Sequence, residues 1–158
     1  GVHDLAIRQV LEAFGGVKHR LQHVFTNNDI AFYNDSKATD IEATQTALNS
    51  FQKPTIWLAG GLDRGDDLMR LLPNLLHVKA VIAFGETQQK VVAVARAANK
   101  PVITVADVEQ AVPVAVKLAV AGDVVLLSPA AASWDQYKSF EERGERYVTE
   151  LKLSLIHI

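Results

Sequence analysis

The chain has 158 residues, of which 49% are hydrophobic and 22% charged, with a formal net charge of −2 and no cysteine. This length and balance suit one soluble globular domain with one core, and the lack of cysteine excludes disulfides and thiolate chemistry. The charge gives no reason to expect a nucleic-acid partner, and no apolar run approaches the ~20 residues that cross a bilayer. The first residues lack the basic and apolar regions of a signal peptide, so we expect a cytoplasmic location.

The amino-terminal part of the sequence predicts a short helix followed by a hairpin. Residues 3–14 carry apolar side chains at helical spacing, and Gly15-Gly16 ends that pattern. Two runs of strand-like residues follow, at 20–26 and 30–34, with Asn27-Asn28-Asp29 between them. Polar turn residues between two such runs are typical of a β-hairpin.

From residue 41 onward, helical patterns alternate with short apolar runs. The runs are nearly continuous and rich in β-branched residues, which is typical of parallel strands buried on both faces; they cover 55–59, 80–84, 102–105 and 124–127. Helical spacing covers 41–51, 68–75, 91–98 and 108–115, and a last helix carries Phe140, Tyr147, Val148 and Leu151. This alternation predicts an α/β fold of three αβα layers. Its sheet would be mostly parallel, with about six strands and one antiparallel edge strand from the hairpin.

Four loops of the predicted sheet are candidate sites, because ligands of open α/β sheets bind beyond the carboxyl ends of the strands. They comprise residues 35–39, 60–66, 85–86 and 128–133. Three of the four are unusually polar or rich in glycine.

The first loop predicts an anion site. Thr39 and Glu42 have the spacing of a capping box, so we expect Thr39 to be the N-cap of a helix that ends near Phe51. Lys37 would then stand just ahead of a helix N-terminus. Exposed amides, the helix dipole and the ammonium would together favour a carboxylate or a phosphate there. The alternative is an ordinary capped helix with a solvated lysine nearby.

The second loop, residues 60–66, is glycine-rich but lacks the order of a phosphate-binding P-loop. Its glycines could let the backbone approach a ligand, and Arg64 could hold an anion through two hydrogen bonds. A flexible turn with a surface arginine explains these residues equally well.

The third loop places a run of small residues directly after a buried strand, which leaves room for a ligand. Ser133 offers a hydroxyl there, and Trp134 and Phe140 offer apolar walls. Tight packing of the small residues, with Trp134 in the core, is the alternative. The charged stretch that follows spaces Glu142 and Arg146 as a normal i, i+4 pair, and we interpret its charges as solvated surface.

Other classes of site lack their patterns in this sequence. The five histidines are scattered, and the aspartates at 63, 66 and 67 lack the spacing of a calcium loop, so we predict no metal site. No G-x-S-x-G elbow points to a serine hydrolase. No G-x-G-x-x-G opens a βαβ unit, which disfavours a nucleotide-binding oxidoreductase.

Three motifs, in this order along the chain, closely resemble those of the Mur ligase family. They are Asn34-Asp35-Ser36-Lys37-Ala38-Thr39, then Gly60-Gly61-Leu62-Asp63-Arg64-Gly65, and then residues 127–144 with Ser128-Pro129-Ala130-Ala131-Ala132-Ser133-Trp134-Asp135. The resemblance extends from about residue 6 to residue 151. Residues 14–20 also resemble the family's hinge between its central and carboxy-terminal domains.

The resemblance implies a division of the chain into three parts. Residues 1–17 would end a central domain and form the hinge, and residues 18–152 would be the Rossmann-like, amino-acid-binding carboxy-terminal domain. Residues 153–158 follow no usable pattern and are interpreted as a tail that could come from cloning.

The resemblance also implies part of an ATP-dependent ligase of bacterial, cytoplasmic peptidoglycan synthesis. The motifs look like those of members that add D-glutamate to UDP-N-acetylmuramoyl-L-alanine through an acyl phosphate. Other domains of that family bind the UDP group, the phosphates of ATP and Mg²⁺. We therefore expect this domain to bind D-glutamate, to close over ATP and to be inactive alone, and we expect a monomer.

The family pattern assigns roles to individual residues of this sequence. The positions that contact D-glutamate are matched by Lys37, Thr39, Ser133, Trp134 and Phe140. Arg20 and Asp35 match positions that contact ATP, and Arg64 stands where other members have a lysine near the reacting phosphate. Ala131 replaces a cysteine that is common in the family, and the bulk of Trp134 in place of leucine would narrow the pocket.

Two alternatives remain open at this point. A sister ligase for another amino acid, such as a diamino acid, is disfavoured because its Asp-Asn-Pro-Arg signature is absent. A free-standing, non-catalytic α/β domain that binds a small ligand is the other.

Overall fold

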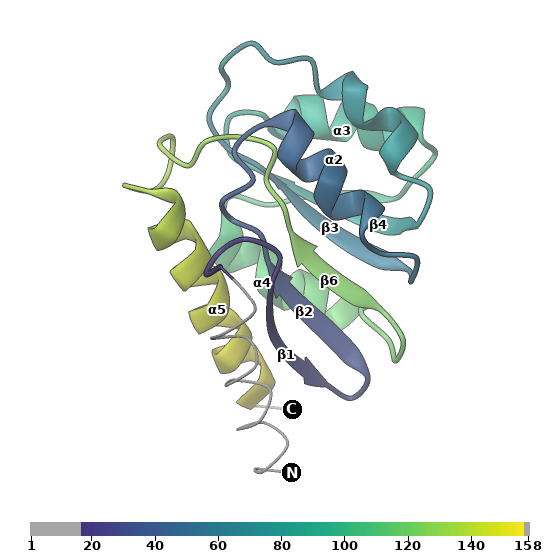
Figure 1. Ribbon diagram of the computed structural model, residues 1–158, viewed down its shortest axis with the longest axis vertical. Coiled ribbons are helices and arrows are strands. Elements are labelled where there is room, and N and C mark those ends of the chain that lie inside the picture. The colour runs from purple at the N-terminus through teal and green to yellow at the C-terminus, as the bar shows by residue number, and fades with distance from the viewer. Residues whose placement is uncertain (1–16, 157–158) are drawn as a thin grey trace.

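A computed structural model describes residues 17–156 (Figure 1), so the helix expected over residues 3–14 and most of the expected hinge lie outside it. The described chain forms a six-stranded sheet in the order β1-β2-β6-β3-β4-β5. The strands are β1 (Gln22–Asn27), β2 (Ile30–Asn34), β3 (Thr55–Gly60), β4 (Val78–Phe84), β5 (Val102–Thr104) and β6 (Val124–Leu127). Only the β1–β2 pair is antiparallel within this sheet, which confirms the expected mostly parallel sheet with one antiparallel edge strand.

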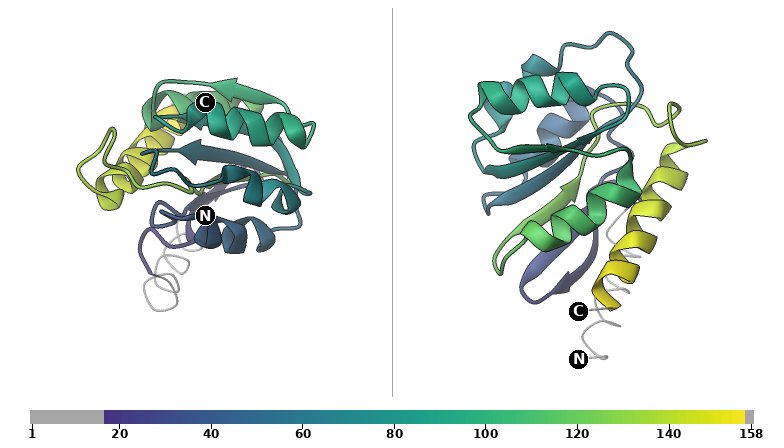
Figure 2. Two further views of the ribbon diagram at one scale, coloured as in Figure 1. Left: turned by 90° about the horizontal axis from the view of Figure 1, so that it is seen from above. Right: turned by 180° about the vertical axis from the view of Figure 1, so that it is seen from behind.

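Helices cover both faces of the sheet, as the three-layer prediction requires (Figure 2). They are α2 (Ile41–Asn49), η1 (Leu68–Asn74, a 3₁₀ helix), α3 (Gln88–Ala97), α4 (Val108–Leu118) and α5 (Phe140–Ile156). Side chains of α2, η1 and α3 pack on one face, and those of α4 and α5 pack on the other. None of these helices is long and apolar enough to cross a membrane.

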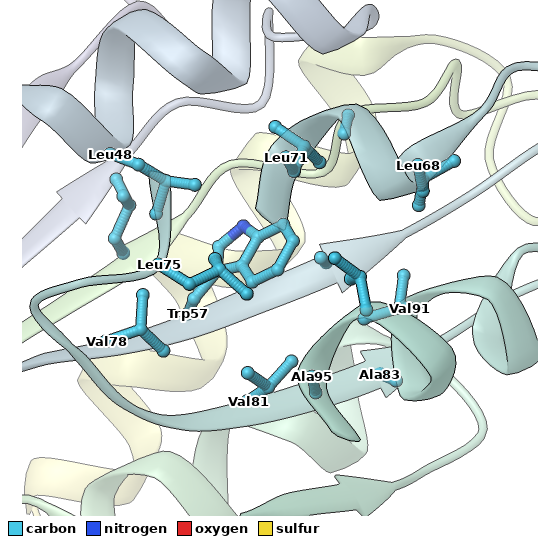
Figure 3. Packing of buried hydrophobic residues seen from close by; sticks show 14 of the residues in the cluster. Leu48, Trp57, Leu68, Leu71, Leu75, Val78, Val81, Ala83, Val91 and Ala95 are labelled. Atoms are coloured by element: carbon cyan, nitrogen blue, oxygen red, sulfur yellow. The ribbon is translucent and has the colours of Figure 1, made fainter. Parts of the chain in front are cut away.

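Each face of the sheet has its own core because side chains alternate along a strand. In β3, Trp57 faces α2, η1 and α3, while Ile56 and Leu58 face α4 and α5. Trp57 lies among Leu71, Leu75 and other aliphatic side chains of the first core (Figure 3). Its indole Nε1 donates a 2.8 Å hydrogen bond to the carbonyl oxygen of Ser128. The core is therefore fastened directly to the loop that follows β6.

The hairpin is tighter than the sequence pattern indicates. Asn28 and Asp29 form a two-residue turn with φ angles of 51° and 61°, a left-handed conformation that asparagine and aspartate tolerate well. Strand β1 begins at Gln22 and not at residue 20, because Leu21 has a φ of 41° and interrupts the extended chain.

The structure differs from the prediction in the type of one helix and at the ends of several others. The pattern over residues 68–75 forms a 3₁₀ helix and contains Pro73, whose nitrogen has no hydrogen to donate. Helix α2 ends at Asn49, before Phe51, where Ser50 N bonds back to the Ala47 carbonyl and closes the last turn. Helix α5 continues to Ile156, so the segment interpreted as a tail begins inside a helix.

Candidate functional site

The loops that follow β2, β6 and β3 lie side by side at the carboxyl edge of the sheet, because these strands are neighbours. We call residues 35–39 the Lys37 loop, residues 60–66 the Arg64 loop and residues 128–134 the Ser133 loop. Ala130 N donates to the Ala38 carbonyl at 3.0 Å, and Leu62 N donates to the Ala132 carbonyl at 2.9 Å. The Ser133 loop thus joins the other two along one rim.

Two glycines of β3 and the Arg64 loop allow this close approach. A Cβ on Gly60 would lie 1.9 Å from the Phe84 carbonyl oxygen, and one on Gly61 would lie 2.3 Å from the Ala132 carbonyl oxygen. Their φ angles of 142° and 158° are open to glycine. The glycine-rich pattern therefore brings backbones together at this rim.

The Lys37 loop and the start of α5 are tied together. Ser36 Oγ donates a 2.7 Å hydrogen bond to the Phe140 carbonyl oxygen, and Lys37 Nζ lies 6.0 Å from the centroid of the Phe140 ring. The ring of His19 meets the same Phe140 ring edge-on, with centroids 6.0 Å apart. Lys37, the predicted cation, and Phe140, predicted as an apolar wall of the site, thus lie next to each other although they are 103 residues apart in the sequence.

The predicted capping role of Thr39 is wrong, because Asp40 is the N-cap of α2. Asp40 has an extended backbone, and its Oδ1 accepts a 2.8 Å hydrogen bond from Ala43 N. Thr39 lies one residue outside the helix, where its N–H bonds to the Lys37 carbonyl at 2.8 Å. Its own carbonyl oxygen accepts a 3.0 Å hydrogen bond from Arg64 Nη2, which brings Arg64 to the Lys37 loop.

Asp35 is buried at the floor of this rim, with 4% of its surface exposed. Its two carboxylate oxygens accept hydrogen bonds from Leu21 N at 2.9 Å and from Ser128 Oγ at 2.7 Å. Burial raises the pKa of Asp35, while these hydrogen bonds and the charge of Arg20 act in the opposite direction. The exposed Arg20 and the buried Asp35, both predicted to contact ATP, are therefore electrostatic neighbours.

Ser133 and Trp134 take opposite positions in the Ser133 loop. Ser133 is 2% exposed, whereas Trp134 is 64% exposed and does not belong to the core. This loop bends sharply at Ala130, whose φ of 59° is unusual for alanine. The prediction that Trp134 could be part of the core is therefore wrong, and the indole faces solvent.

Arg143 is the site residue that reasoning from the sequence missed. Its stretch was interpreted as solvated surface, yet Arg143 is fully buried. Its guanidinium donates to Ser36 Oγ at 3.0 Å, to the Ser36 carbonyl at 2.7 Å and to the Ala131 carbonyl at 2.9 Å. Burial lowers its pKa to about 10, so it stays charged at neutral pH. One fork of donors therefore locks the Lys37 loop to the Ser133 loop.

A separate cleft of about 330 Å³ lies beyond the ends of β4 and β5, lined by Glu86, Val105, Ala106 and Asp135 among others. It includes the candidate loop of residues 85–86, but none of the residues to which the family pattern assigns a role lines it. Carboxylate and amide side chains supply its polar groups. Among residues 17–156, no group of three or more His, Asp or Glu side chains is placed to hold a metal ion.

Comparison with known proteins decides the family. The model of the Mur ligase, glutamate ligase domain, matches residues 19–131. The chain belongs to the Mur ligase family. It is 72% identical over 155 residues to the UDP-N-acetylmuramoylalanine–D-glutamate ligase of Leuconostoc citreum, covering 98% of this chain and 34% of that protein. It is 57% identical to the ligase of the same name from Geobacillus kaustophilus, covering 94% of this chain and 33% of that protein.

The chain thus spans about a third of the length of these Mur ligases. Solved structures show the same fold at low identity. The UDP-N-acetylmuramate–alanine ligase of Thermotoga maritima matches with a TM-score of 0.61 and 15% identity, covering 92% of this chain and 33% of that chain. A domain from a putative ligase of Haemophilus ducreyi matches with a TM-score of 0.52 and 23% identity, covering 84% of this chain and 99% of that one. The Rossmann-like fold implied by the motifs is confirmed.

Proposed function

We propose that this domain recognises D-glutamate and completes the ATP site of a ligase that joins D-glutamate to UDP-N-acetylmuramoyl-L-alanine. The observation that supports this best is the convergence of Lys37, Phe140, Thr39 and Arg64 on one rim of the sheet. The names of the relatives at 72% and 57% identity supply the amino acid and its acceptor. In this proposal the ligase is a cytoplasmic monomer, and the domain is inactive alone.

The reacting groups need only be brought together, once ATP has supplied the phosphoryl group that turns the acceptor carboxylate into an acyl phosphate. Attack by the D-glutamate amine gives a tetrahedral intermediate, which collapses to the amide. Holding an amine at such an acceptor can lower the barrier by about 7–11 kcal/mol in the best cases. Orientation is therefore the contribution we assign to this domain.

Lys37 and Thr39 would hold the side-chain carboxylate of D-glutamate. Lys37 offers a charge and Thr39 a hydroxyl on the same short loop. The N-terminus of α2 adds nothing to this site, because the carboxylate of Asp40 already caps it. Phe140 and Trp134 would cover the aliphatic part of the amino acid, and Ser133 would bond a polar group. The ligand would then point its amine away from the rim.

Arg64 and Arg20 would neutralise phosphate charge, and Asp35 would accept a hydrogen bond from ATP. Arg64 fits this role because its guanidinium already stands at the rim on the Thr39 carbonyl, an acceptor that an anion can replace. Mg²⁺ would be held by other domains of the ligase, since the described residues present no cluster of metal ligands.

The test is ADP release by a full-length ligase that contains this domain, with UDP-N-acetylmuramoyl-L-alanine as acceptor. We expect Lys37→Ala to raise the KM for D-glutamate at least about tenfold, as loss of a charged hydrogen bond does, with the KM for ATP nearly unchanged. Lys53→Ala, on the loop before β3, is the matched control. An unchanged KM for D-glutamate would reject the assignment of Lys37. Better turnover with L-glutamate or a lysine-like amino acid in place of D-glutamate would reject the choice of D-glutamate.

A further inference from the structure

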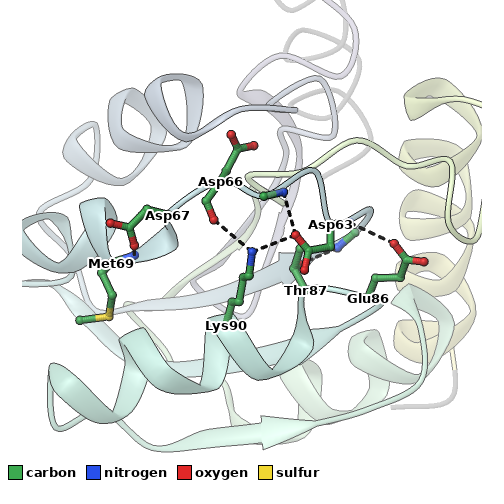
Figure 4. A network of polar contacts seen from close by, with 9 residues as sticks. Asp63, Asp66, Asp67, Met69, Glu86, Thr87 and Lys90 are labelled. Carbon is green, nitrogen blue, oxygen red and sulfur yellow. Dashed lines mark hydrogen bonds and ion pairs between the residues drawn. The ribbon is translucent and has the colours of Figure 1, made fainter.

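Lys90 of α3 contacts the Arg64 loop on both sides of Arg64 (Figure 4). Its Nζ donates to Asp63 Oδ1 at 2.8 Å and to the carbonyl oxygen of Asp66 at 3.3 Å. Asp63 Oδ1 also accepts a 2.9 Å hydrogen bond from Gly65 N. The backbone from Asp63 to Asp66 is thus drawn around one ammonium, and Arg64 lies within that turn.

Two further contacts fasten the Arg64 loop to the residues just before α3. Glu86 Oε1 accepts a 3.1 Å hydrogen bond from Asp63 N, and Thr87 Oγ1 accepts one of 3.1 Å from Gly61 N. Thr87 N donates in turn to the Gly61 carbonyl at 3.0 Å. The Arg64 loop therefore takes much of its position from the segment that leads into α3.

We infer that Lys90 is a positioning residue for Arg64. By holding the Asp63 carboxylate and the Asp66 carbonyl, it sets where the Arg64 guanidinium stands over the rim, where that guanidinium now rests on the Thr39 carbonyl at 3.0 Å. The inference rests on the proposed function, because it takes Arg64 as the cation beside the reacting phosphate.

The expected effect is kinetic, with little effect on stability. The side chains of Lys90 and Asp63 are each 39% exposed, and an exposed ion pair shifts a local equilibrium by about two- to five-fold. The hydrogen bond from Lys90 is the main reason why the pKa of Asp63 is lowered, so the carboxylate of Asp63 stays charged in the neutral range. Small displacements near a reacting centre are felt strongly in rate. Loss of the ion pair between Lys90 and Asp63 should therefore lower kcat and leave the fold intact.

The test uses three variants of the full-length ligase, with kcat and KM measured by ADP release. Lys90→Met should lower kcat by about two- to five-fold while the KM for D-glutamate stays the same, and Lys90→Arg should keep kcat near that of the parent. The matched control is Arg70→Met, which removes another exposed ion pair, Arg70–Glu42 at 2.7 Å, without removing a hydrogen bond of the Arg64 loop. A melting temperature within about 2 °C of the parent should accompany each variant.

Arg64→Ala separates this inference from the proposed function. If Arg64→Ala leaves kcat unchanged, both the phosphate-side role of Arg64 and the role of Lys90 are wrong. If Arg64→Ala lowers kcat and Lys90→Met does not, only Lys90 is misassigned. We expect Lys90→Met to add nothing to Arg64→Ala, since a positioning residue has no effect once the residue it positions is gone. A double variant whose losses multiply would overturn the inference.

Amide hydrogen exchange provides a readout that does not depend on turnover. In the Lys90→Met chain, the amide of Gly65 should exchange faster than in the parent, because its acceptor Asp63 Oδ1 loses its second partner. The amide of Ala43, bonded to Asp40, should be unaffected. Equal protection of Gly65 in both proteins would show that Lys90 does not order the loop.

Discussion

The imidazole ring of His19 occupies the space beside Gly144 of α5. A Cβ on residue 144 would lie 2.2 Å from Nδ1 and 2.7 Å from Cε1 of His19. The ring is held in place by a 2.9 Å hydrogen bond between its Nδ1 and Nδ2 of Asn34, and His19 is only 3% exposed. The turn that precedes β1 is therefore packed against α5 with no spare room.

Gly144→Ala should destabilise the chain, although alanine favours a helix by about 1 kcal/mol over glycine. The added methyl group must displace a buried, hydrogen-bonded ring, and overpacking of this kind costs about 1–3 kcal/mol. Urea unfolding of the parent and variant measures the difference. In a His19→Ala background the same substitution should cost less or stabilise, and an equal cost in both backgrounds would show that the ring is not the obstacle.

Arg143→Met should lower the free energy of unfolding by about 2–5 kcal/mol, because two buried carbonyls and one hydroxyl lose their donor. Arg146→Met, an exposed position on the same helix, is the matched control and should stay within about 0.5 kcal/mol of the parent. Chemical denaturation measures both variants. Similar small losses in the two variants would mean that water replaces the guanidinium between the loops.

Asp35→Asn should make the free energy of unfolding of the chain depend less on pH. Because burial raises the pKa of Asp35 above its ordinary 3.8, the folded state binds the proton more tightly than the unfolded chain. The resulting stability is complete below pH 3.8 and is lost as pH rises through the raised pKa. The parent should therefore lose more stability than Asp35→Asn between pH 4 and neutrality.

Unfolding curves at several pH values for both proteins measure this difference, and the other acids cancel in the comparison. If the stability of both proteins changed equally with pH, the raised pKa of Asp35 would be contradicted. In the full-length ligase the same variant should lose ATP affinity, so that a residue that costs stability at neutral pH would be kept for binding.

Asp40→Ala should cost about 1 kcal/mol of stability, because it removes the oxygen that caps Ala43 N at the start of α2. Thr39→Ala is the control and should change stability by less than about 0.5 kcal/mol, because Thr39 lies outside the helix. Thermal unfolding of the two variants distinguishes them. The reverse order would restore Thr39 as the cap.

The centre of the sheet could be predicted from the sequence because β3, β4 and β6 are short, apolar and almost fully buried. The run at 102–105 also forms a strand, but β5 lies at an edge of the sheet and is largely exposed, so the prediction that it is buried on both faces is wrong. The first and last residues of the helices and strands could not be predicted as well. Thr39 and Asp40 are both good N-cap residues, and only the backbone conformation at residue 40 selects between them. Leu21 is similar, because its left-handed backbone follows from the bond between its amide and Asp35, which is distant in sequence.

Arg143 shows why part of the site could not be predicted from the sequence. Arg143, Tyr147 and Leu151 fall at i, i+4 and i+8, on the buried face of α5, so the period itself placed the arginine inward. Charged side chains are usually exposed, and for that reason the stretch was interpreted as solvated surface in spite of this spacing. Its acceptors, Ser36 and Ala131, belong to two loops that meet only when β2 and β6 pair. Such partners become visible only in three dimensions.

The central place of β6 has a consequence for synthesis on the ribosome. β2 and β3 are consecutive in the chain, yet they do not pair with each other; each pairs with β6, which is made last. A nascent chain that ends before residue 124 therefore has two separate half-sheets, each with an open strand edge that can join another chain. Protection against such self-association depends on the emergence of four residues, Val124–Leu127.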